Sequence, residues 1–280
     1  MGNILVALFA IIIDRYFGAF NFPKHPAVII GELIDSFEES YYKDSFFRGF
    51  LLVSFVIGVI SIFAFSISFY LGQFNIVVNT LFSSIIASFF IRHRRLSDFV
   101  TGVLRAENTQ DRKETFCKFV KGDCDKLSED TIYKTTIKTY AKHLNNDVIA
   151  PIFYLLLFGL PGIVLYKTIS IITTMADTKE EKYRRYGEFA SSLDKLLTFI
   201  PKYITATLIT LVSRTKENLS LYEKAEIYKN PHSALSLAVT NKMIHLQFHL
   251  IKVLTIRNQI DLFIILALAL VYFLLLLLAS

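Results

Sequence analysis

Charged residues are missing from two long parts of this 280-residue sequence. No Asp, Glu, Lys or Arg occurs between Gly49 and Ile91, and none occurs from Leu262 to Ser280. The hydrocarbon core of a bilayer is about 30 Å thick, and a helix needs ~20 apolar residues to cross it. The first run is therefore long enough for two crossings and the second for one. The sequence predicts an integral membrane protein.

Patterns that mark several soluble enzyme classes are missing as well. No stretch of alternating apolar and polar residues is long enough to form a sheet, so the predicted fold is all-α. The sequence has neither a glycine-rich phosphate loop of the Walker type nor a Gly-x-Ser-x-Gly turn. Its net charge of +6 accompanies abundant apolar segments. This combination favours a basic surface that faces the membrane over nucleic-acid binding.

Cysteine is scarce, with only Cys117 and Cys124 in the whole chain. Two cysteines are too few for a four-cysteine metal site, and a cytoplasmic location argues against a disulfide bond. We therefore expect both residues to be thiols that pack as small apolar side chains.

The apolar runs predict about four membrane-spanning helices. The first is interpreted as a retained anchor, because it lacks the basic start of a cleaved signal peptide and carries Asp14 and Arg15 near its end. These two charges are expected to pair near the interface or to face the protein interior. The predicted spans cover residues 1–20, 49–71, 74–91 and 260–280.

A further apolar stretch, residues 149–173, is interrupted by Gly159, Pro161 and Gly162. A complete crossing here would export many Lys and Arg residues, against the usual bias of membrane proteins. Helix-breaking residues instead allow a re-entrant pair of half-helices, provided that protein covers the exposed backbone. We expect such an element here. Residues 199–212 are too short for an easy crossing and are expected to form an interfacial or buried helix.

Loop charge predicts the orientation of the chain. Residues 92–148 contain twelve Lys or Arg, which begin directly at the end of a predicted span. Because positively charged loops tend to stay on the cytoplasmic side, the polar segments 92–148 and 174–258 are expected there. The sequence thus predicts one multi-pass domain of residues 1–280 in the cell (inner) membrane.

Short motifs occur in an order that is typical of a known family. Near the start, Asp14 and Gly18 precede His25-Pro26 and Gly31. The middle of the chain holds Ala150-Pro151-Ile152-Phe153-Tyr154, Gly159-Leu160-Pro161, Tyr166-Lys167, Met175, Lys179, Lys182-Tyr183-Arg184, Gly187, Asp194 and Pro201. In identity and spacing these motifs resemble the CobD/CbiB family, the adenosylcobinamide-phosphate synthases of cobalamin biosynthesis. The resemblance covers residues 4–238.

The resemblance implies a reaction and its participants. Family members join a carboxyl group of adenosylcobyric acid to the amine of an aminoalkyl phosphate such as aminopropanol phosphate, which gives adenosylcobinamide phosphate. This implies an ATP-dependent ligase with Mg²⁺, no permanently bound cofactor, corrinoid and aminoalkyl phosphate substrates, and a lipid bilayer as the environment. The metal ligands, the particular amine and the oligomeric state stay open.

Such chemistry needs cationic groups that hold phosphate and a group that takes the proton of the amine. Lys179, Lys182, Tyr183 and Arg184 match the family and are candidate substrate-binding residues. Lys and Arg bind phosphate by charge and by forked hydrogen bonds. The alternative is a solvated polar face, because acidic residues interleave with these cations.

The remaining candidates each have a structural alternative. Asp123 and Asp194 are candidate catalytic carboxylates that contact a metal or the amine, and the alternative is helix capping. His25 is a candidate acid–base or corrin-contacting group, or else a structural residue of its turn. Asn145 and Asn146 are candidate substrate-binding residues, and their alternative is capping of the apolar helix that follows.

Several positions depart from the family pattern, three of them at carboxylates that bear on the chemistry. Lys138 and Lys142 stand where the family has glutamates, and Thr173 stands where it has an aspartate. An active enzyme must bind metal or activate the amine without these carboxylates. The alternative is therefore a catalytically degenerate member that acts as a membrane scaffold in the cobamide pathway. A transporter is disfavoured, because the sequence shows no inverted repeat.

Overall fold

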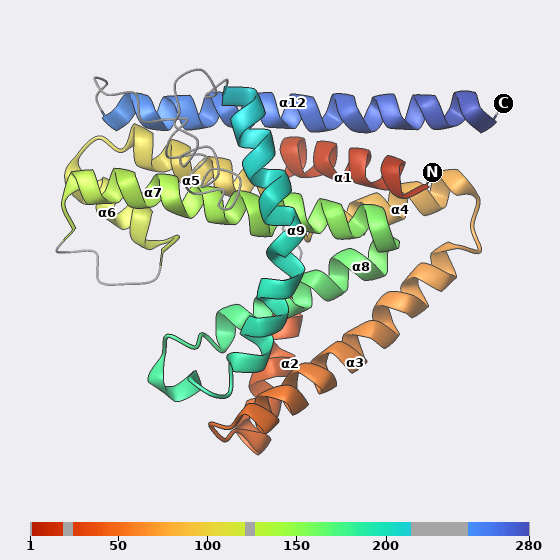
Figure 1. Cartoon of the computed structure of the whole chain (residues 1–280), viewed down its shortest axis with the longest axis horizontal. Helices are drawn as coiled ribbons and strands as arrows, with labels where there is room; N and C mark the ends of the chain where they lie inside the picture. The colour runs from red at the N-terminus through yellow and green to blue at the C-terminus, as the bar shows by residue number, and fades with distance from the viewer. Residues whose placement is uncertain (1, 19–24, 121–126, 214–245, 280) are drawn as a thin grey trace. The chain divides into compact units, whose positions relative to one another are not determined.

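The computed structural model describes residues 2–18, 25–120, 127–213 and 246–279 (Figure 1). Within these ranges every regular element is a helix, which confirms the predicted all-α class. The α-helices are α1 (Gly2–Phe17), α2 (Pro26–Tyr41), α3 (Phe46–Leu71), α4 (Ile76–Ser88), α5 (His93–Arg105), α6 (Thr109–Cys117), α7 (Glu129–His143), α8 (Ala150–Met175), α9 (Glu188–Ser213) and α12 (Leu246–Ala279). A π-helical turn, η1 (Leu144–Ile149), joins α7 to α8, and a 3₁₀ turn, η2 (Glu181–Tyr183), precedes α9.

The helices confirm a multi-pass membrane protein. In the described part of the chain, five are long and apolar enough to cross a bilayer, close to the four that the sequence predicts. The predicted first span differs: α1 has 16 residues, fewer than the ~20 that a crossing needs, and is not among the five. The five candidates are Phe46–Leu71, Ile76–Arg105, Glu129–Met175, Glu188–Val212 and Lys252–Leu278.

The chain folds as two compact units. The first unit contains Met1–Arg92 and Ala150–Phe199, and the second contains His93–Ile149 and Ile200–Ser280. In the first unit α1 packs on α4, and α8 packs on α2 and α3. In the second unit α5 packs against α6, α7 and α12.

The predicted break in the apolar stretch 149–173 is present at Gly159 of α8. Gly159 has φ 66° and ψ −153°, a conformation that favours glycine, and Pro161 follows two residues later. The chain folds back there, as Figure 1 shows. The rings of Tyr154 and Tyr166 stack with centroids 5.1 Å apart. Twelve residues of straight helix would separate them by about 18 Å, so α8 consists of two half-helices, as expected.

The fold-back lines an open apolar pocket of about 370 Å³ in the first unit. Tyr154 and Phe158 line it from one half of α8, and Leu165 and Tyr166 line it from the other. The Tyr154 hydroxyl donates a hydrogen bond to the Leu197 carbonyl, 3.0 Å away, and this contact ties α8 to α9.

The expectation of a short helix at 199–212 is wrong. Residues 199–212 belong to α9, which has 26 residues and begins at Glu188, with Pro201 inside it. A negative charge in the first turn suits the positive end of the helix dipole. The polar residues before Phe199 hid this start, because they form the more polar half of one continuous amphipathic helix.

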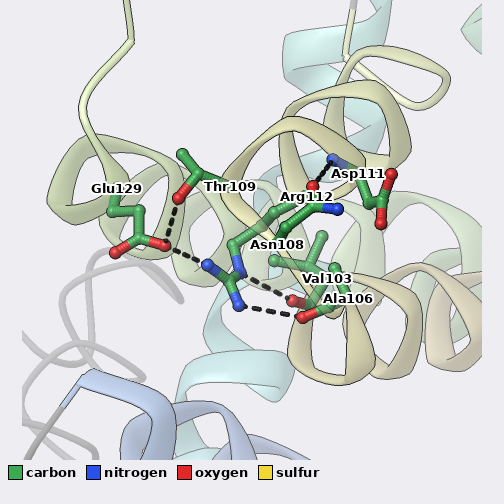
Figure 2. Close-up of polar contacts among 7 residues, drawn as sticks. All are labelled: Val103, Ala106, Asn108, Thr109, Asp111, Arg112 and Glu129. Atoms are coloured by element: carbon green, nitrogen blue, oxygen red, sulfur yellow. Dashed lines mark hydrogen bonds and ion pairs between the residues drawn. The ribbon is translucent and has the colours of Figure 1, made fainter.

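A buried arginine holds three helices of the second unit together (Figure 2). Arg112 of α6 is 6% exposed. Its Nε donates to the Val103 carbonyl at 3.3 Å, its Nη2 donates to the Ala106 carbonyl at 3.0 Å, and its Nη1 pairs with Glu129 of α7. The guanidinium also lies 5.3 Å from the centroid of the Tyr133 ring. The last turn of α5, α6 and the start of α7 are thereby joined through one side chain.

The prediction of packing thiols is also wrong. Cys117, the last residue of α6, is disulfide-bonded, and no described cysteine is free. Cys124, the other cysteine of the prediction, lies outside the described residues. The prediction rested on the cellular compartment alone, which says nothing about how close two sulfur atoms lie.

Candidate functional site

Two short polar segments meet in the first unit, at the ends of helices long enough to cross a membrane. Residues 42–45 join α2 to α3, and residues 176–187 join α8 to α9 (Figure 1). A Cβ atom on Gly49 of α3 would lie only 1.9 Å from the Tyr186 carbonyl oxygen. Only glycine permits this approach, and it lets the second segment rest directly on α3.

The segment 176–187 is fixed by residues at the end of α2. Asp44 Oδ1 accepts hydrogen bonds from the backbone N–H groups of Arg185 and Tyr186, at 2.8 and 2.9 Å. The Tyr42 hydroxyl donates to the Lys182 carbonyl. The backbone on both sides of Tyr183 is therefore held in place.

The side chains of Lys182, Tyr183 and Glu38 form a continuous polar chain. Lys182 Nζ donates to the Tyr183 hydroxyl at 2.9 Å, and this hydroxyl donates to Glu38 Oε2 at 2.9 Å. The same Nζ lies 4.9 Å from the centroid of the Tyr42 ring and 4.6 Å from that of Tyr183. These distances are within the range of cation–π attraction. The ammonium group is thus held by aromatic faces and by a hydroxyl.

The surroundings shift the pKa values of these groups. Burial raises the pKa of Glu38 above its usual 4.5, while the hydrogen bond from Tyr183 and the charge of Lys182 act in the opposite direction. The hydrogen bond to Tyr183 raises the pKa of Lys182. Burial, and next the charge of Glu38, raise the pKa of Tyr186. Lysine therefore stays charged in this cluster, and the carboxyl of Glu38 holds its proton more tightly than an ordinary glutamate.

Two oxygen atoms of the cluster have no hydrogen-bond partner among the described residues. They are Glu38 Oε1 and the Tyr186 hydroxyl, and both atoms are shielded from solvent. A buried polar atom without a partner costs about 1–3 kcal/mol, so these two oxygens are the least satisfied groups of the cluster.

The structure brings together two of the predicted substrate-binding residues, Lys182 and Tyr183. Lys179 and Arg184 lie on the same loop with exposed side chains. The prediction missed the rest of the cluster. Three of its residues contact the loop across 140 to 145 positions of sequence, which no local pattern could reveal, and Tyr186 lies on the loop but is buried. The missed residues are Glu38, Tyr42, Asp44 and Tyr186.

The structural role weighed for His25 is present. His25 is the N-cap of α2, and its Nδ1 accepts a hydrogen bond from the Ala27 N–H at 3.1 Å, with Pro26 at the first helical position. Its ring also meets Phe89 edge-on, with centroids 6.1 Å apart. The catalytic role of His25 stays a prediction.

The two candidate aspartates differ in what the structure says of them. Asp194 lies in the interior of α9, six residues after Glu188, and is half-buried, so it is not a helix cap. Asp123 lies outside the described residues.

Asn145 and Asn146 lie in the second unit, in the π-helical turn η1. Asn145 is 1% exposed; its Oδ1 accepts from Thr205 Oγ1 at 3.0 Å, and its Nδ2 donates to Asn146 Oδ1 at 2.7 Å. Helix runs through this turn from α7 into α8, so the alternative weighed for these residues, capping of a new helix, does not hold. Asn145 instead ties η1 to α9, and the substrate-binding role of both residues stays a prediction.

The described residues contain no group of three His, Cys, Asp or Glu side chains that could hold a metal ion. Mg²⁺ usually keeps several waters and is bound through one or two carboxylates together with substrate phosphates. Asp194 is the candidate ligand that the family resemblance supplies.

The comparisons with known proteins agree with one another. Residues 7–257 match the protein family described as "CobD/Cbib protein". "Probable cobalamin biosynthesis protein CobD" of Pyrococcus furiosus is 32% identical over 203 residues, 71% of this chain and 70% of the relative. The protein of the same description from Methanococcus maripaludis strain S2 is 30% identical over 223 residues, 75% of this chain and 72% of the relative.

A bacterial relative is matched over more of the chain. "Cobalamin biosynthesis protein CobD" of Halalkalibacterium halodurans is 24% identical over 255 residues, 87% of this chain and 80% of the relative. No solved structure matches the chain significantly.

Proposed function

The chain belongs to the CobD/CbiB family of cobalamin-biosynthesis proteins, and from this premise we propose that it is an ATP-dependent amide ligase. It joins a carboxyl group of adenosylcobyric acid to the amine of an aminoalkyl phosphate, such as aminopropanol phosphate. The product is adenosylcobinamide phosphate. The reaction takes place at the cytoplasmic face of the cell membrane.

The observation that carries this proposal is the cationic loop between α8 and α9. Lys179, Lys182 and Arg184 are exposed on a segment of six residues whose backbone is fixed to the end of α2. Phosphate groups are bound by such clustered cations, and a fixed backbone reduces the entropy that binding costs. An aminoalkyl phosphate and a nucleotide both present phosphate to this surface.

The chemistry needs an activated carboxyl group and a free amine. A carboxylate is a poor acyl donor, so it would first take the terminal phosphoryl group of ATP with release of ADP, and attack by the amine would then expel phosphate. Mg²⁺ bound with the nucleotide would neutralise its phosphates. The amine attacks only after it has lost a proton, and Asp194 is the family-matched group of the described residues that is proposed to take it. The cations of the loop stabilise the negative charge that develops on oxygen.

The proposed location follows from charge and helix ends. The segment 176–187 lies between α8 and α9, and both belong to candidate membrane spans. Its cations suit the side on which positively charged loops accumulate. A corrinoid made in the cytoplasm would reach the site there.

A turnover assay tests the proposal. Full-length protein in nanodiscs receives adenosylcobyric acid, aminopropanol phosphate, ATP and Mg²⁺, and mass spectrometry follows the corrinoids. We expect an amide product in the native protein and a loss of at least tenfold in K182A and D194A. K134A, an exposed lysine of α7, is the matched control and should keep its activity. Folded native protein that makes no product with any aminoalkyl phosphate would overturn the ligase and leave the membrane scaffold as the explanation.

A further inference from the structure

Two tyrosine rings, those of Tyr42 and Tyr183, lie beside the Lys182 ammonium group, and a third, the buried ring of Tyr186, packs against both of them. Tyr42, Tyr183 and Tyr186 form a mutually contacting set, which we name the tyrosine cage. The ring centroids are 5.9 Å apart for Tyr42 and Tyr183, 5.2 Å for Tyr42 and Tyr186, and 6.1 Å for Tyr183 and Tyr186. Cages of aromatic rings are a recurring means of binding ammonium ligands, because each ring presents a negative face.

The carboxylate of Glu38 lies beside the cage, and only one of its two oxygens accepts a hydrogen bond from a described residue. Glu38 Oε2 accepts the Tyr183 hydroxyl, whereas Oε1 is shielded from solvent and has no partner among the described residues. A primary ammonium has three N–H donors. Within the described part of the chain, Lys182 donates to the Tyr183 hydroxyl and makes no ion pair with Glu38, so the carboxylate is left for another cation.

The ammonium group of Lys182 is held weakly enough for another cation to displace it. Its side chain is exposed, and its Nζ is held by one hydroxyl and two ring faces. Exposed cation–π contacts are worth only about 0.5–1 kcal/mol, so a better cation can replace it. The backbone that carries it stays fixed by Tyr42 and Asp44.

We propose that Glu38 and the tyrosine cage bind the ammonium group of the aminoalkyl phosphate, and that Lys182 occupies this place until the substrate displaces it. The identification of the ligand rests on the proposed function. The displaced Lys182 stays on the same loop as Lys179 and Arg184, where its charge meets the phosphate of the substrate. The site thus recognises both charges of the zwitterionic substrate. Lys182 gives up its contacts with the tyrosine cage and pairs with the phosphate instead.

Calorimetry with three probes on full-length protein in nanodiscs tests this assignment. Propylammonium carries the amine alone, propyl phosphate carries the phosphate alone, and aminopropanol phosphate carries both. In E38Q we expect the Kd of propylammonium and of aminopropanol phosphate to rise about tenfold, since an ion pair with a partly buried carboxylate is lost. The Kd of propyl phosphate should be unchanged. E39Q, the exposed neighbour, is the matched control.

K182M is the more decisive variant, because displacement of Lys182 predicts opposite changes in affinity for the two probes. Propylammonium should bind about threefold more tightly, since it no longer competes with the lysine for the cage. Propyl phosphate should bind more weakly, since a cation has been removed. If E38Q leaves the affinity for propylammonium unchanged, or if K182M weakens it, the assignment is overturned.

The turnover assay separates this inference from the proposed function. Amide formation that continues with unchanged amine affinity in E38Q overturns the ammonium site and leaves the ligase. Amine binding that depends on Glu38 in a protein that makes no amide overturns the ligase and leaves the ammonium site. A native protein that neither binds the amine nor makes product overturns both.

Discussion

Arg112 and Lys182 are both cations that lie against tyrosine rings, but their surroundings differ in kind. Arg112 is 6% exposed, and all three guanidinium nitrogens donate to oxygen acceptors (Figure 2). Lys182 is exposed, makes one side-chain hydrogen bond, and lies beside the carboxylate of Glu38, which has an oxygen without a partner among the described residues.

This difference separates a structural cation from one in a binding site. A buried charge is tolerated when its hydrogen bonds are complete, and its removal leaves buried acceptors without donors. An exposed charge in an incomplete cluster contributes little to stability, but the cluster retains free capacity for a ligand. We therefore expect replacement of Arg112 by methionine to lower stability, and the same replacement of Lys182 to change ligand binding without changing stability.

The largest expected effect is that of R112M, which keeps the volume of the side chain and removes its charge. Loss of the pair with Glu129, whose side chain is exposed, and above all of the donors to two carbonyl groups should cost about 2–4 kcal/mol, and lower Tm by about 5–10 °C. Thermal unfolding in nanodiscs, followed by circular dichroism, measures this change. K182M should leave Tm unchanged. Equal losses of Tm in the two variants would mean that Arg112 and Lys182 contribute alike to stability.

The next largest effect is expected for N145A, in the second unit. Asn145 links η1 to Thr205, so its loss should cost about 1–2 kcal/mol and lower Tm by about 3–5 °C. The affinity for aminopropanol phosphate should stay within twofold of the native value, because a buried residue with this partner acts on the fold. A tenfold loss of affinity without a change in Tm would instead support the substrate-binding role that the family resemblance suggests.

The sequence predicts the elements that local chemistry determines. The break at Gly159 was predictable because glycine and proline act on the backbone at their own position. The true start of α9 at Glu188 was missed because a polar half and an apolar half form one helix, and only tertiary packing shows that they are continuous.

The candidate site consists of the loop between α8 and α9 and of residues at and after the end of α2, and only residues of the loop were predicted from the sequence. Lys182 and Tyr183 belong to a charged motif and were found from the sequence. Glu38 was missed because its bond to Tyr183 joins positions 145 residues apart. A glutamate near the end of an amphipathic helix looks like a solvated residue until the fold places a loop over it.

A smaller effect is expected when the pH is lowered, and it concerns the affinity for propylammonium. Burial raises the pKa of Glu38 above 4.5, so the protonated form favours the fold and its carboxylate is lost at a higher pH than usual. Propylammonium needs the carboxylate, and its affinity should therefore fall about tenfold as the pH drops through this raised pKa. The pKa of Lys182 is also raised, so the lysine stays charged throughout. Calorimetry from pH 7.5 to about 4.5 measures the change, and the affinity of E38Q should not vary over this range. An identical pH dependence in both proteins would place the titrating group elsewhere.

The smallest effect is expected for Y183F, which keeps the ring of the cage and removes one hydroxyl. That hydroxyl donates to Glu38 and accepts from Lys182, so it orients both groups. Without this hydroxyl, both oxygens of the Glu38 carboxylate depend on the incoming ammonium for hydrogen bonds. The Glu38 and Lys182 side chains are also no longer held in a fixed orientation, which weakens binding. We expect the Kd of propylammonium to rise about threefold, less than in E38Q, because one neutral hydrogen bond is worth about 1 kcal/mol. Y41F, an exposed tyrosine of α2, is the matched control. A loss in Y183F larger than in E38Q would mean that the hydroxyl, and not the carboxylate, binds the amine.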